Sequence, residues 1–211
     1  MDGYVNIDYP PVEHTVQSGL TADRYEDIVE LKFDAGTVDE VRLHHVFEHF
    51  TRQVAMALLC RWTDWLKPGG LLRIETPDVM ACARALLSPF RSDGYKQQVI
   101  RHLFGSHEAK WAGHWDGWYE SRFRETLGAL GYRNLRIARN RWGALRNIEV
   151  VGERSERKFT IDEYRSIVAR LLTKSLVTHV APRSRAAIAN SELSMHDVWM
   201  RDWERAYSGG R

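Results

Sequence analysis

Three histidines and a glutamate stand close together in the first quarter of the chain: His44, His45, Glu48 and His49. Imidazole and carboxylate groups orient bound molecules, move protons near neutral pH and bind zinc. The spacing H-H-x-x-E-H is neither the H-E-x-x-H pattern of zinc enzymes nor another complete ligand set, and no cysteine cluster accompanies it. We therefore expect no metal at these residues and predict that they line a binding site. A helix N-terminus that Glu48 stabilises is the alternative.

The densest aromatic group of the sequence surrounds a fourth histidine, His114. Its members are Trp111, Trp115, Asp116, Trp118 and Tyr119. Aromatic rings with a histidine and an aspartate suit a sugar-like or planar molecule, and His114 is a candidate base that removes a proton from a hydroxyl of that molecule. The alternative is a loop that packs its own aromatic rings over the core, and Trp118 fits that alternative.

Two aspartates near the N-terminus are candidates for cofactor binding. Asp8 ends a short apolar strand, where a carboxylate can accept hydrogen bonds from the hydroxyls of a ribose. A turn before Pro10 is the other interpretation. Asp27 carries a weaker form of the same prediction, since Glu26 and Glu30 compete with it and a solvated loop charge is the alternative.

The elements around the first histidine cluster predict a parallel crossover. Residues 38–46 are β-branched and apolar enough for a buried strand that ends on the histidines. From Thr51 onward, apolar residues recur on one helical face, at Ala55, Leu58, Leu59, Trp62 and Leu66. The Lys-Pro-Gly-Gly sequence at 67–70 is expected to stop this helix and turn the chain into a strand at 71–76. Such a unit is parallel, and open α/β sheets bind ligands at the carboxyl ends of their parallel strands.

Three segments in this order resemble class I S-adenosylmethionine (SAM)-dependent methyltransferases. The segments are HVFEH at 45–49, LKPGG at 66–70 and IETPD at 74–78. They are similar to the HVLEH and LKPGG segments of bacterial members, and the likeness extends over residues 3–153. It implies an α/β fold with a Rossmann-like sheet and an antiparallel C-terminal hairpin. It also implies SAM as cofactor and S-adenosylhomocysteine as product.

The resemblance also implies roles for the candidate residues. In similar proteins the counterpart of Asp8 holds the ribose of SAM, and the counterpart of Asp27 lies near the adenine. The histidine cluster at 44–49 would lie beside the methionine moiety, and His114 matches a later landmark of the same group. The implied acceptor is an oxygen or a nitrogen. Because similar proteins look associated with surface-polysaccharide assembly, we expect a sugar hydroxyl.

One departure from the family pattern concerns the N-terminus. Such methyltransferases have a first strand and a Gly-rich loop before the segment that resembles residues 3–8, and the given sequence starts at Met1 without them. That loop binds the methionine end of SAM at a helix N-terminus. We expect either a shortened methyltransferase that lacks the first strand or a non-catalytic remnant that binds a partner. In a remnant, Trp199, Trp203 and Tyr207 would be buried between chains.

The rest of the sequence predicts more strands and helices and a helical extension. Strands are expected at 4–8, 27–31, 132–138 and 145–151, and helices at 78–87, 96–104 and 121–130. Thr160 and Glu163 form a capping box that opens a helix through about Lys174, and Ser194 is expected to cap a last helix. We therefore divide the chain into a core, 1–154, and a helical extension, 155–211. The extension is expected to pack against the core, a second copy or a partner chain.

The composition limits the class of protein. Hydrophobic residues make up 44% and charged residues 27%, as in globular proteins, and the net charge of +2 gives no reason to expect a nucleic-acid partner. Cys60 and Cys82 have no C-x-x-C spacing and are expected to be buried thiols of a reducing compartment. The sequence has neither a signal peptide nor a long apolar run, so we expect a cytoplasmic protein without a membrane span. The lack of a G-x-G-x-x-G motif argues against a nucleotide-binding oxidoreductase.

Overall fold

A four-stranded sheet in the order β3-β4-β6-β5 forms the centre of the protein. The computed structural model describes residues 3–10, 12, 21–180 and 186–210. Strand β3 (Val38–His44) is parallel to β4 (Leu66–Pro77), and β6 (Leu145–Arg154) lies antiparallel between β4 and β5 (Tyr132–Trp142). The expected α/β fold with an antiparallel C-terminal hairpin is therefore confirmed.

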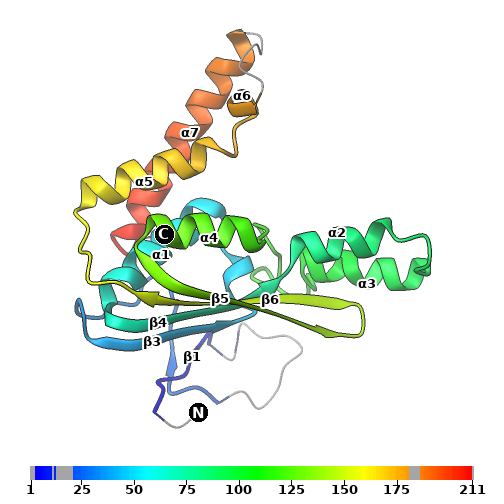
Figure 1. Cartoon of the computed structure of the whole chain (residues 1–211), viewed down its shortest axis with the longest axis horizontal. Coiled ribbons are helices and arrows are strands. Elements are labelled where there is room, and N and C mark those ends of the chain that lie inside the picture. Colours follow the sequence, from blue (N-terminus) through cyan, green and yellow to red (C-terminus); the bar gives the residue numbers. More distant parts are fainter. Residues whose placement is uncertain (1–2, 11, 13–20, 181–185, 211) are drawn as a thin grey trace.

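A separate parallel pair of strands contains the N-terminal candidate aspartate. Strand β1 (Ile7–Asp8) pairs with β2 (Arg24–Tyr25), and Figure 1 shows β1 on the β3 side of the molecule. In the described part of the chain, β3 has β4 as its single hydrogen-bonded neighbour, so the two sheets are not joined. The strand predicted at 27–31 is wrong, because residues 28–30 form a turn. The Asp27 carboxylate stabilises that turn by accepting a hydrogen bond of 2.9 Å from the Val29 amide.

Helix α1 (Arg52–Trp65) connects the parallel strands and is buried along most of its length. It ends at Trp65, and Leu66 already belongs to β4. The Lys-Pro-Gly-Gly sequence was expected to be a turn between helix and strand, but it is an irregularity within β4. Val38 pairs with Leu66 and Glu40 with Leu71, so the strand gains residues between these pairs. Proline has no amide hydrogen for the ladder, and Gly69 adopts a φ of 83°, which explains the break in register.

Most of the helices lie on one side of the four-stranded sheet (Figure 1). Besides α1, the described chain contains the short 3-10 helix η2 (Phe47–His49) and the helices α2 (Val79–Leu87), α3 (Asp93–Phe104), α4 (Glu120–Ala129), α5 (Ile161–Thr173), α6 (Val177–Val180) and α7 (Ala186–Tyr207). Helices α2 and α3 extend towards the tip of the β5-β6 hairpin, and the upper part of α7 stands away from the sheet. The three predicted helices between β4 and β5 are thus present.

The C-terminal helices share one hydrophobic core with the sheet. Trp203 of α7 is fully buried in the same cluster as the apolar side of α1. The hydroxyls of Tyr164 and Tyr207 donate to the two carboxylate oxygens of Asp64 on α1, at 2.8 and 2.9 Å. The capping box at Thr160 is present, but Ser194 lies inside α7 and does not cap it, so that prediction is wrong. The division at residue 154 stays a prediction.

Candidate functional site

The carboxyl ends of the two parallel strands bring a histidine and a glutamate side by side. The register of the sheet pairs His44, the last residue of β3, with Glu75 near the end of β4. The Nε2 atom of His44 lies 3.4 Å from Oε1 of Glu75. The sequence separates these two residues by an entire helix, so the parallel crossover is what places them together.

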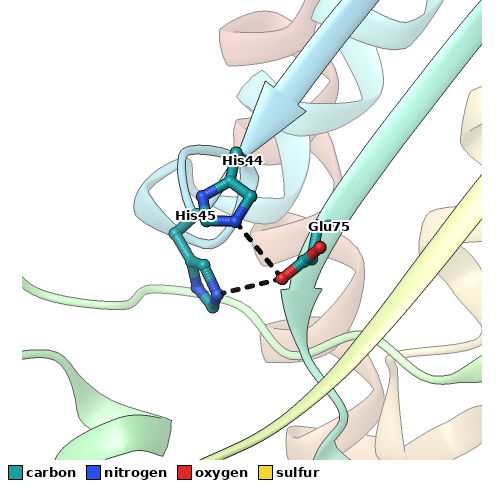
Figure 2. Close-up of side chains that lie close together, drawn as sticks. All are labelled: His44, His45 and Glu75. Carbon is teal, nitrogen blue, oxygen red and sulfur yellow. Dashed lines mark ion pairs between the residues drawn. The ribbon is translucent and has the colours of Figure 1, made fainter. Parts of the chain in front are cut away.

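The second histidine reaches the same carboxylate because its backbone leaves the extended conformation. Successive side chains of a strand point to opposite faces, yet His44 and His45 both face Glu75 (Figure 2). His45 has a φ of 53°, which turns its side chain back, and its Nε2 lies 3.6 Å from Oε1 of Glu75. A left-handed residue of this kind costs on the order of 1–3 kcal/mol, and such strain is concentrated at functional sites.

Glu48 is the buried centre of the cluster, with 1% of its surface exposed. Its Oε1 accepts a hydrogen bond from Nδ1 of His45 at 2.9 Å, and its Oε2 accepts one from the Thr76 hydroxyl at 3.1 Å. Burial raises the pKa of Glu48, but the hydrogen bond and charge of His45 outweigh it, so this pKa lies below its usual range. Burial lowers the pKa of His45, and Glu48 reverses that effect to a net rise. The pair is therefore a buried carboxylate held against an imidazole.

His49 connects the cluster at residues 44–49 to the long segment between α3 and α4. Its Nδ1 donates to the Gly113 carbonyl at 3.1 Å, and its ring meets that of His114 edge-on at 4.8 Å between centroids. The backbone carbonyl of Glu48 accepts a hydrogen bond of 2.9 Å from the Trp115 amide. Hydrogen bonds of Glu48 and His49 therefore join this loop to β4 and to residues 113–115.

His114, the predicted base, lies beside Glu48 in a small cavity of about 10 Å³. Its Nδ1 atom is buried and has no hydrogen-bond partner among the described residues. Burial lowers the pKa of His114 to about 4, with Glu48 acting in the opposite direction. The imidazole is therefore neutral at physiological pH and has a lone pair available, although its basicity is low.

Acidification should weaken the fold through His114. An unfolded histidine has a pKa of about 6.5, so between about pH 6.5 and 4 the unfolded chain binds a proton that the folded chain excludes, and stability falls as the pH falls. Allowing for partial solvent exposure, we expect a loss of about 1–2 kcal/mol over that interval. The variant His114→Gln lacks this histidine, so its free energy of unfolding should fall less than that of the unsubstituted chain over the same pH interval. Urea unfolding at several pH values measures the difference. The exposed His107→Gln is the control, and an equally steep loss in His114→Gln would contradict the assignment.

Asp8 at the end of β1 and Asp27, which follows β2, form a second group of candidate residues. Oδ1 of Asp8 accepts a hydrogen bond of 2.7 Å from the Tyr9 amide. The Tyr9 hydroxyl donates to Oδ2 of Asp27 at 3.4 Å, so one tyrosine links both carboxylates. The predicted cofactor residues thus fall into two groups, one beside β1 and β2 and one at the end of β3.

Two further residues near the histidine cluster were not predicted from the sequence. The side-chain amide of Asn147 on β6 donates to Oε1 of Glu75 at 3.3 Å, and the ring of His102 on α3 lies 5.8 Å from that of His45. Asn147 stands between Arg146 and Ile148 in a strand of mixed polarity, so the sequence gives no signal that singles it out. Nothing in the sequence around His102 distinguishes it from a surface histidine of a helix.

Three further features lie outside this cluster: the two cysteines, a second cavity and the apolar character of the helices. Cys60 and Cys82 are buried and unpaired as expected, and burial raises the pKa of both thiols, to about 11 for Cys82. A larger cavity of about 200 Å³ lies among α1, α4 and α5, and Tyr119 of the predicted aromatic group is among the residues that line it. None of the helices described here is long and apolar enough to cross a bilayer.

Comparison by structure finds SAM-dependent methyltransferases. No model of a known protein family and no curated protein matches the chain by sequence. One similar structure is the Burkholderia thailandensis 1,6-didemethyltoxoflavin-N1-methyltransferase with 1,6-didemethyltoxoflavin and S-adenosylhomocysteine bound, at 14% identity and a TM-score of 0.44, over 64% of this chain and 52% of that chain. Two SAM-dependent methyltransferases, from Archaeoglobus fulgidus and Methanosarcina mazei, are each 12% identical to this chain.

These two have TM-scores of 0.42 and 0.45, over 63% and 72% of this chain and 67% and 81% of theirs. The chain spans about half the length of the Burkholderia enzyme. At these identities the similarity concerns the arrangement of helices and strands alone.

Proposed function

We propose that the chain binds SAM and takes part in methyl transfer to an oxygen or nitrogen acceptor. The observation that carries the proposal is the convergence of His44, His45, Glu48 and Glu75 at the carboxyl ends of two adjacent parallel strands. This edge is where open α/β sheets bind their ligands. The resemblance of the same residues to the methyltransferase segments supports the choice of ligand.

The residues present suit the proposed cofactor. Asp8 ends a strand and offers carboxylate oxygens for the ribose hydroxyls, and Asp27 is linked to it through Tyr9. The sulfonium of SAM is a cation, and the buried carboxylate of Glu48 in η2 favours a positive charge nearby. When bound, SAM supplies the methyl group. The chain contributes positioning and a surrounding of fixed charges.

His114 is the residue that we assign to proton transfer. Its neutral imidazole has a buried Nδ1 without a partner in the described structure, and this atom can accept a proton from an acceptor hydroxyl. The cavity beside it is only about the size of a single water molecule, so an acceptor has to displace part of the 105–119 segment. We propose a sugar hydroxyl of a surface-polysaccharide precursor as the acceptor and the cytoplasm as the place of reaction.

A second candidate function is that of a non-catalytic binding or assembly partner. The observation that favours it is that β3 has one neighbouring strand in the described structure, which leaves its other edge available for a strand. Trp203 does not serve this role, because it is buried within the chain.

Calorimetric titration with S-adenosylhomocysteine tests the first proposal. We expect a Kd on the order of micromolar, and the substitution Asp8→Ala should weaken binding by about tenfold or more. Asp39→Ala, which removes an exposed carboxylate paired with Lys67, is the matched control.

Each outcome of this titration decides between the candidates. An Asp8→Ala affinity within about twofold of the unsubstituted chain would show that Asp8 does not hold the ribose. A folded chain that shows no binding at all would reject the methyl-transfer proposal and favour the assembly partner.

A further inference from the structure

We propose that His44, His45 and Glu75 form a binding site for a divalent transition-metal ion, with Zn²⁺ as the best match. The potential ligand atoms of the three residues all lie within 4.8 Å of one another. The sequence predicted no metal, because the third ligand comes from β4 and is invisible in the H-H-x-x-E-H spacing. The proposal goes beyond methyl transfer from SAM, which does not require a metal.

The two distances from the histidines to Glu75 match the edges of a tetrahedral site. Zn²⁺ binds histidine nitrogen and carboxylate oxygen at about 2.0–2.2 Å, so two of its ligand atoms lie about 3.4 Å apart. Oε1 of Glu75 lies 3.4 Å from Nε2 of His44 and 3.6 Å from Nε2 of His45. Figure 2 shows that both rings approach the Glu75 carboxylate from the same side. Two histidines and a glutamate are a known set of ligands for zinc with an open fourth position.

The hydrogen bond to Glu48 prepares His45 as a ligand. Nδ1 of His45 donates its proton to the buried carboxylate of Glu48 at 2.9 Å, which leaves the lone pair on Nε2. That lone pair faces another acceptor, Oε1 of Glu75. Two acceptors face each other favourably only when a cation or a second proton lies between them. A carboxylate behind a ligating histidine is the usual outer partner in zinc sites.

The surroundings of the site fix Glu75 in place and leave His44 exposed to solvent. Asn147 donates to Oε1 of Glu75 at 3.3 Å, and the Glu75 side chain is 12% exposed. The His44 side chain is 68% exposed, so it can adjust and an ion can enter from solvent. The fourth position would be taken by water or by an oxygen of a bound molecule.

A second group of possible ligands is less suitable. Ligand atoms of Glu48, His49 and His114 also lie within 4.8 Å of one another. However, both oxygens of Glu48 already accept hydrogen bonds, from His45 and Thr76. An ion there would compete with the two bonds that organise the cluster, so we assign the site to the Glu75 group.

Zinc titration of the 211-residue chain without SAM or its product tests the proposal. We expect one Zn²⁺ per chain by calorimetry at pH 7.5, and a Co²⁺ complex with the visible absorption of a tetrahedral site. Glu75→Gln keeps the size of the side chain and an acceptor for Asn147, and His44→Ala alters an exposed residue, so both variants should fold. Each should weaken Zn²⁺ binding by more than tenfold, since even outer partners of zinc ligands contribute about 10–100-fold.

The controls separate this site from its alternatives. His107→Ala removes an exposed histidine outside the site and should leave the affinity unchanged. Absence of one-to-one binding by the unsubstituted chain would overturn the proposal and mean that a proton lies between His45 and Glu75. Binding that survives His44→Ala but is lost in His49→Ala would overturn it in favour of the Glu48 group. None of these results depends on whether S-adenosylhomocysteine binds.

Discussion

Replacing Trp203 by alanine should lower the free energy of unfolding by about 3–5 kcal/mol. The indole is fully buried between α7 and the core, and it stacks on Tyr207 with ring centroids 5.5 Å apart. Its loss opens a cavity in the layer that joins the C-terminal helices to α1, and the tyrosine bonds to Asp64 prevent easy collapse of that space. Urea unfolding followed by circular dichroism measures the effect.

Trp142 supplies the matched control for this experiment. It lies at the end of β5 with 79% of its surface exposed, so Trp142→Ala should change the stability by less than about 0.5 kcal/mol. A Trp203→Ala variant as stable as Trp142→Ala would show that α7 does not pack on α1 in solution. The helical extension would then be available for another chain.

Removing Glu48 should cost about 3 kcal/mol of stability. The substitution Glu48→Ala leaves Nδ1 of His45 and the Thr76 hydroxyl without their partner in a buried place. It also removes the negative charge that raises the pKa of His45. Glu48→Gln keeps a hydrogen-bond acceptor of the same size, and we expect it to cost about 0.5–1.5 kcal/mol. Chemical unfolding at pH 7 compares the two variants.

Glu26→Ala is the control for the loss of a glutamate. Glu26 pairs with Arg24 at 2.7 Å on the surface, and an exposed pair of this kind is worth less than about 1 kcal/mol. Equal losses for Glu48→Ala and Glu26→Ala would mean that the Glu48 carboxylate is not a buried centre of the site.

The sequence was most informative where local chemistry decides structure. Periodic apolar residues located α1, and the alternation of residues after Gly131 located the β5-β6 hairpin. The capping box at Thr160 started α5 where the side chains can satisfy the first backbone amides. The strand at 27–31 failed because an Asx turn at Asp27 competes with strand propensity. Ser194 failed as a cap because a serine can also occupy the interior of a long helix.

The candidate site also combines features that local sequence sets with features that the tertiary structure sets. The sequence by itself determined the cluster at 44–49 and its place after a parallel strand, because the polarity of a strand end is a local property. The tertiary structure alone decided that Glu75 meets both His44 and His45, that Asn147 donates a hydrogen bond to Glu75, and that burial lowers the pKa of His114. Register across the sheet, the left-handed backbone at His45 and desolvation are properties of the assembled fold. Spacing along the chain therefore pointed away from a metal, while the distances across the sheet support one.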